Sequence, residues 1–125
     1  MGHRNWREAC DYVKKFSKPG DVTIPSEPLT VHYYGCINIQ YYIADDYTNS
    51  PQFLVKDEKR ISDIEALKKV VSNNSRGWLL VDSGRFYSSF LILKDLREFI
   101  FNNLTYHDVG NDRTVLIFSW DEYGI

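Results

Sequence analysis

The residues best suited to bind a ligand come directly after a continuous apolar run. Trp78–Val81 is apolar throughout, and the next residues, Asp82 to Arg85, read Asp-Ser-Gly-Arg. A strand that is apolar on both faces is typical of a sheet interior, and ligands of open α/β sheets bind at the carboxyl ends of such strands. Asp82 would act there as an acid or acceptor, Ser83 as a donor and Arg85 as an anion clamp. The same residue types also make ordinary turns and caps, so a purely structural role stays open.

Two tyrosines extend this predicted site. Tyr33 and Tyr34 follow the first predicted strand, and we expect their rings to form an aromatic wall on the same rim. The preceding His32 has no paired carboxylate or cysteine nearby, which makes it a poor general base. Aromatic residues make up 15% of the chain. That share is typical either of a tyrosine-rich core periphery or of a surface for sugars, lipid headgroups or partner proteins.

The sequence lacks the motifs of nucleotide, metal and covalent chemistry. It contains no glycine-rich phosphate loop, no Gly-x-Ser-x-Gly and no Cys-x-x-Cys, and Pro25–Pro28 stands where a dinucleotide site needs glycines. The acidic pairs Asp45–Asp46 and Asp57–Glu58 lie among polar loop residues and are interpreted as solvated charges. No nucleophile is paired with a base in the sequence. We therefore expect no catalytic residue, no cofactor and no metal ion.

Composition and charge describe one ordinary globular domain. With 125 residues, of which 43% are hydrophobic and 26% charged, the chain is long enough for its own core. The formal net charge of −2 argues against nucleic-acid binding, and no apolar run is long enough to span a membrane. The two cysteines, Cys10 and Cys36, fit either a disulfide or two separate buried thiols. Residues 1–3 are predicted to lie outside a domain that spans residues 4–125.

Hydrophobic periodicity predicts four helices. The first, residues 6–16, has apolar side chains at helical spacing and ends before Pro19-Gly20. The third begins at the capping box Ser62–Glu65. The predicted helices span residues 6–16, about 29–42, 62–72 and 89–103.

The strands between these helices favour an α/β fold. They are predicted at residues 22–24, 52–55, 78–81, 106–109 and 115–118. This order favours a three-layer sandwich with a mainly parallel, Rossmann-like sheet of about five strands, in which Trp78–Val81 is interior. The short joint at residues 110–113 favours an antiparallel edge at the C-terminus. Side chains expected in the core are Trp6, Val13, Ile64, Leu67, Val71, Leu80, Leu96 and Ile100.

The opening of the chain resembles a known family. A Trp-Arg-Glu-Ala helix, Trp6–Ala9, runs into Lys-Pro-Gly-Asp-Val at Lys18–Val22 and then into a strand. This segment is similar to the start of the soluble C-terminal domain of polytopic membrane glycosyltransferases. These enzymes use polyprenyl-phosphate sugars and are related to protein mannosyltransferases and the aminoarabinose transferase. The sharp motif covers about residues 6–24, and the order of elements extends the resemblance over most of the chain.

The resemblance implies a non-catalytic domain on the extracytoplasmic face of a membrane, as part of a polytopic membrane protein. The catalytic acidic residue of those enzymes lies in a loop between membrane helices, and this chain has no counterpart of that loop. The implied partners are the membrane-embedded portion of the same polypeptide and a glycan or protein acceptor. The alternative function is a stand-alone α/β module that binds a small anionic ligand at the Asp82–Arg85 rim. A small hydrolase or transferase ranks last, because no nucleophile–base pair is apparent.

Overall fold

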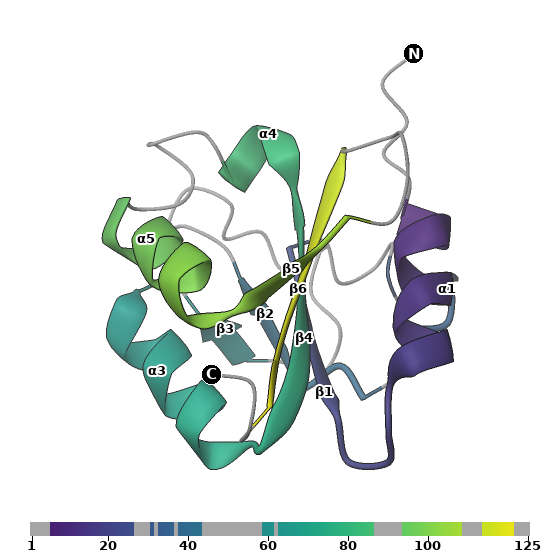
Figure 1. Cartoon of the computed structure of the whole chain (residues 1–125), viewed down its shortest axis with the longest axis horizontal. Helices are drawn as coiled ribbons and strands as arrows, with labels where there is room; N and C mark the ends of the chain where they lie inside the picture. Colours follow the sequence, from purple (N-terminus) through teal and green to yellow (C-terminus); the bar gives the residue numbers. More distant parts are fainter. Residues whose placement is uncertain are drawn as a thin grey trace.

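Helices and strands alternate through the part of the chain that the computed structural model describes. That part comprises residues 6–26, 31, 33–36, 38–43, 59–61, 63–86, 94–108 and 114–121. The strand expected at residues 52–55, the two acidic pairs and His32 lie outside it. Figure 1 shows the elements in chain order: α1 (Trp6–Phe16), β1 (Val22–Pro25), β2 (Tyr41–Ile43), β3 (Lys59–Ile61), α3 (Ile64–Asn73), β4 (Arg76–Asp82), α4 (Ser83–Phe86), α5 (Lys94–Asn103), β5 (Thr105–His107) and β6 (Val115–Asp121).

The central sheet is mixed rather than mainly parallel. Its strand order is β1-β4-β6-β5, and β6 runs antiparallel to both β4 and β5, while β1 runs parallel to β4. A second, two-stranded sheet pairs β2 with β3 in parallel, and a parallel bridge joins Thr23 of β1 to Ile39. The expected mainly parallel, Rossmann-like sandwich is therefore wrong.

The antiparallel pairings come from the last strand. Only residues 108–114 join β5 to β6, too few for the crossover that a parallel pairing needs. Val115–Phe118 is buried throughout, so β6 inserts between β4 and β5 and leaves the shorter β5 at the edge. The prediction that Trp78–Val81 is an interior strand is confirmed, because β4 lies between β1 and β6.

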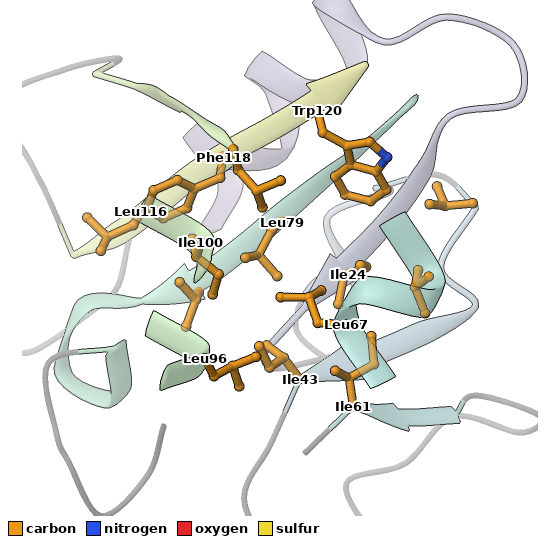
Figure 2. Packing of buried hydrophobic residues seen from close by; sticks show 14 residues of the cluster. Ile24, Ile43, Ile61, Leu67, Leu79, Leu96, Ile100, Leu116, Phe118 and Trp120 are labelled. Atoms are coloured by element: carbon orange, nitrogen blue, oxygen red, sulfur yellow. The ribbon is translucent and has the colours of Figure 1, made fainter. Parts of the chain in front are cut away.

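Helices α3 and α5 cover one face of the sheet (Figure 1). Asp63, rather than the first residue of the predicted capping box Ser62–Glu65, caps α3, since its carboxylate accepts a hydrogen bond of 2.8 Å from the Ala66 N–H. Figure 2 shows Leu67 of α3 and Ile100 of α5 in the apolar cluster that these helices form with the sheet. Of the side chains expected in this core, Ile64 and Val71 are only partly buried, because they lie at the margin of the cluster.

Gly77 makes room for the largest side chain of this layer. It pairs with Trp120 across β4 and β6, and a Cβ at Gly77 would overlap the indole ring. The ring is 3% exposed, and its Nε1 donates a hydrogen bond of 2.7 Å to the Asn74 carbonyl at the end of α3. The glycine therefore allows the indole to lie flat against β4.

Helix α1 covers the opposite face and is linked covalently to the segment after β1. Its buried stripe packs on Trp78 and Leu80 of β4 and on Val115 and Ile117 of β6. Cys10 of α1 forms a disulfide with Cys36, which decides between the two alternatives that the sequence left open.

The helix expected over residues 29–42 is wrong after Tyr33: Val31 and Tyr33 are helical, but the helix does not continue beyond them. Within the described residues, a turn at Tyr34-Gly35 is followed by the bridge at Ile39 and by β2. Gly35 has φ +80° and Asn38 has φ +52°, left-handed conformations that interrupt a right-handed helix.

Candidate functional site

The carboxylate of Asp82 lies at the carboxyl end of β4, as expected, but it is buried and hydrogen-bonded within the protein. Asp82 is 1% exposed, and its Oδ1 accepts a hydrogen bond of 3.0 Å from the Ser26 hydroxyl. The Asp82 N–H donates back to the same hydroxyl at 3.1 Å, and the Ser26 N–H donates to the Leu80 carbonyl at 2.9 Å. Asp82 and Ser26 therefore tie together the ends of the parallel strands β1 and β4.

Ser83 and Arg85 begin the short helix α4 directly after Asp82. Ser83 is half-buried, and its N–H donates a hydrogen bond of 2.9 Å to the Thr114 carbonyl next to β6. The side chain of Arg85 lies outside the described residues. Ser26, Asp82 and Ser83, which we call the β4 rim, thus join the ends of three strands.

Tyr33 and Tyr34 lie along helix α1. Tyr33 is 81% exposed, and the two tyrosine rings meet edge to face at 5.0 Å. Arg7 lies 5.4 Å from the centre of the Tyr34 ring, and the Lys14 ammonium donates to the Tyr34 carbonyl at 3.2 Å. The structure thus brings Asp82 and Ser83 together on the rim and places Tyr34 beside Arg7 and Lys14 of α1.

A second group of polar side chains lies on the α1 face of strands β5 and β6. Thr105 of β5 and Ser119 of β6 are directly paired. His107 is two residues after Thr105 and Asp121 is two residues after Ser119, so both side chains point to the same face as that pair. Thr105 is exposed, and the other three are half-buried. We call these four residues the β5–β6 shelf. Their neighbours Tyr106, Phe118 and Trp120 point to the opposite face.

His107 connects the shelf to α1. Its Nε2 lies 2.6 Å from the Ser119 hydroxyl, and its Nδ1 lies 3.0 Å from the Tyr12 hydroxyl. The Trp78 ring lies 5.2 Å from the imidazole, and burial lowers the pKa of His107 below its ordinary value. The imidazole is therefore held between two hydroxyls in a form that resists protonation.

Asp21 is linked to the Asp121 end of the shelf through Arg76. Asp21 is 2% exposed, and its carboxylate accepts from the Arg76 Nε at 3.0 Å and from the Trp78 indole at 3.1 Å. It also accepts from the Lys18 N–H at 2.9 Å. Arg76 lies 3.5 Å from Asp121 as well, so one arginine joins the shelf to the start of β1.

The Ser119–His107 pair has the spacing of a nucleophile and a base, yet its surroundings suit binding better than acyl transfer. Ser119 lies inside β6, paired with Trp78 on one side and Thr105 on the other. Backbone N–H groups of an interior strand point at the neighbouring strands, so the Ser119 N–H cannot stabilise an oxyanion. The two hydroxyls beside His107 keep further hydrogen-bonding capacity for a ligand.

Sequence reasoning missed the shelf because it ended the last strand at residue 118. The signal was present in the alternation Phe118-Ser119-Trp120-Asp121, which is apolar and polar by turns, as a strand with one polar face requires. Thr105 and His107 show the same spacing on the preceding strand.

Comparison with protein families and with curated proteins gave no significant match. Among the described residues, no helix combines the length and apolar character needed to cross a membrane. In those same ranges, no three histidine, cysteine, aspartate or glutamate side chains gather as metal ligands.

Proposed function

We propose that this chain is the soluble extracytoplasmic domain of a membrane glycosyltransferase that uses a polyprenyl-phosphate sugar donor. The domain itself is non-catalytic, and it shapes the acceptor side of the enzyme or braces the membrane part. The proposal starts from the resemblance of residues 6–24 to that family.

The observation that carries the proposal is the disulfide between Cys10 and Cys36. Disulfides persist in oxidising compartments and are rare in the cytosol, so this bond is compatible with an extracytoplasmic location. It fixes α1 to the segment after β1 across a sequence separation of 26 residues. Such a covalent link fixes α1 more firmly to the rest of the domain, which suits a bracing role.

The buried state of Asp82 favours this role over the alternative of an anion-binding module. The rim carries a carboxylate that is already hydrogen-bonded to Ser26. A negative charge at this position repels an anionic ligand, and freeing the carboxylate would break its buried hydrogen bond with the Ser26 hydroxyl. A bracing or acceptor-shaping role needs no anion at the rim.

The first test is the redox state and location of the disulfide in the native host. Because Cys10 and Cys36 are buried, location and redox state are read separately. Intact cells are treated with a membrane-impermeant amine-reactive label, and the two cysteines are then mapped by mass spectrometry after denaturation in the presence of a thiol-blocking reagent. We expect the chain to be labelled in intact cells and the two cysteines to be joined in a disulfide. A chain that is labelled only after cell lysis, or free thiols before reduction, would refute the extracytoplasmic assignment.

The second test addresses catalysis. The purified chain is incubated with a polyprenyl-phosphate sugar and acceptor candidates, and sugar transfer is measured beside the complete membrane enzyme. We expect transfer by the complete enzyme and none by the chain alone. Transfer by the isolated chain would show that the domain carries the chemistry itself.

A further inference from the structure

We infer that the β5–β6 shelf binds a neutral oligosaccharide, with Phe16 of α1 as its aromatic wall. The inference rests on the proposed function only for its setting, in which such a ligand is the glycan acceptor. Its physical basis is the arrangement of hydroxyl, imidazole and carboxylate groups beside an exposed ring.

The first step concerns hydrogen bonding. The hydroxyl groups of a sugar both donate and accept, so they need partners of both kinds at one surface. The shelf offers the hydroxyls of Thr105 and Ser119 side by side, with the Asp121 carboxylate as an acceptor next along the strand. Thr105 is exposed and Ser119 half-buried, so both are within reach of a ligand.

The second step concerns the aromatic wall. Phe16 is 48% exposed, and its ring packs on Tyr12 at 4.7 Å. Tyr12 in turn contacts His107 at 5.5 Å. An exposed ring beside hydrogen-bonding groups suits a pyranose, which presents an apolar C–H face as well as polar edges.

The third step places Phe16 at the right level of the shelf. Helix α1 leads from Phe16 to β1 at Val22, which pairs with Gly77, and the adjacent Arg76 pairs with Asp121. The C-terminal end of α1 and the Asp121 end of the shelf therefore lie at the same end of the sheet, as Figure 1 shows. Phe16 is one helical turn beyond Tyr12 in that direction, and Tyr12 contacts His107. Because one helical turn is close to the length of two strand residues, we infer that Phe16 lies level with the Thr105–Ser119 pair.

The fourth step concerns charge. Among the described residues, Arg76 contacts the shelf and is already paired with Asp21 at 3.0 Å and with Asp121 at 3.5 Å. The Lys15 ammonium lies 5.5 Å from the centre of the Phe16 ring. The carboxylates of Asp21 and Asp121 thus balance the cations Arg76 and Lys15, so these four groups have no net charge to attract an anion. This balance favours a neutral glycan over a phosphate, a nucleotide or an acidic sugar.

The experiment is an amide-shift titration of the isotope-labelled chain with the disulfide intact. The probes are mannotriose, cellotriose and chitotriose as neutral oligosaccharides, with inorganic phosphate as the anionic comparison. We expect at least one trisaccharide to shift the amides of Thr105–His107 and Ser119–Asp121 with millimolar affinity, and phosphate to leave them unmoved. The shallow surface buries little of the ligand, so tight binding is not expected.

Phe101 provides the matched control for the wall. It is 51% exposed, close to the 48% of Phe16, and it also packs on an aromatic ring, that of Phe118, but on the α5 side of the sheet. Phe16→Ala should weaken trisaccharide binding about fivefold, in line with the loss of one ring contact, whereas Phe101→Ala should leave it unchanged. If Phe16→Ala does not fold, Thr105→Val replaces it, since this change removes the hydroxyl and keeps the shape.

Three results would overturn the inference. These are the absence of shifts with all three trisaccharides at about 10 mM, shifts confined to another face, and equal losses for the two phenylalanine variants. Each outcome is independent of the cell-labelling result, because the titration needs only the folded chain. If the chain is labelled from outside the cell but binds no glycan, the proposed location stands and the proposed glycan site is wrong.

Discussion

The β4 rim and the β5–β6 shelf contain similar polar residues but use them in opposite ways. At the rim, the Asp82 carboxylate is 1% exposed and bonded to Ser26. On the shelf, Thr105 is exposed and Ser119 is half-buried. A buried polar group is satisfied by the protein itself, whereas a surface hydroxyl keeps capacity for a ligand. A buried polar side chain such as Asp82 therefore serves to hold strands together, whereas an exposed one such as Thr105 is available to a ligand.

The largest expected effect comes from removing the disulfide that holds α1 beside the shelf. The double change Cys10→Ser and Cys36→Ser should lower the free energy of unfolding by about 3.5 kcal/mol, because the unfolded chain regains the freedom of the closed loop. Urea unfolding under oxidising conditions measures this loss. If α1 supports the shelf, the amides of Ser119 and His107 should move in the variant more than those of Asp82. Equal amide shifts at Asp82 and on the shelf would show that the disulfide supports the rim and the shelf alike.

The next effect tests whether the rim is a structural joint. Asp82→Ala should cost about 2 kcal/mol, because the Ser26 hydroxyl and the end of β1 lose a buried partner. Asp82→Asn keeps an acceptor for Ser26 and should cost less than half as much. Thermal and urea unfolding compare the pair. A stable Asp82→Ala protein would show that the carboxylate is not needed for folding, and would reopen the rim as a ligand site.

On the shelf, the same kind of change should cost little stability. Thr105→Val removes an exposed hydroxyl and should alter the free energy of unfolding by less than about 0.5 kcal/mol. Ser119→Ala removes the hydroxyl next to His107 and should cost about 1 kcal/mol, typical of one hydrogen bond. If Thr105→Val lowered the free energy of unfolding as much as Asp82→Ala does, the shelf, like the rim, would serve to hold strands together.

The smallest effect is a pH dependence that arises from His107. Burial lowers its pKa below the ordinary value of about 6.5, so the folded state takes up the proton less readily than the unfolded state. Its contribution to stability is therefore complete above that ordinary pKa and is lost as the pH falls through the lower, folded-state pKa.

His107→Gln provides the comparison for this pH dependence, because glutamine keeps hydrogen-bonding groups and does not titrate. Unfolding free energies at about pH 7.5 and about pH 5 should fall more steeply for the native chain than for the variant. Parallel slopes would indicate that His107 titrates alike in both states, and so that the shelf is open to water at this position.

Local patterns accounted for several elements and failed for others. The apolar spacing of residues 6–16 and the stop at Pro19-Gly20 predicted α1, and the unbroken run at Trp78–Val81 predicted an interior strand. The helix over residues 29–42 failed after Tyr33, because apolar residues there fit a helix and a strand alike. Gly35 and Asn38 decide against the helix through their left-handed backbone.

The position of the last strand within the sheet was beyond the sequence pattern. Val115–Phe118 was predicted as one half of a hairpin at the edge, and its hairpin with the preceding strand is observed. Its insertion beside β4 makes the sheet mixed, and this placement depends on which neighbour best covers both faces of β6. Such a choice is made by packing between segments far apart in the chain.

The sequence by itself determined the elements whose signals are local: the amphipathic helix α1, the capped helix α3 and the doubly buried strand β4. These follow from periodicity, capping and backbone restraints within a few residues. Tertiary structure alone decided that Cys10 bonds to Cys36, that Asp82 is hydrogen-bonded to Ser26, and that His107 lies between Tyr12 and Ser119. Each of these contacts joins segments that only folding brings together, so its existence depends on the whole packing arrangement and not on any local pattern.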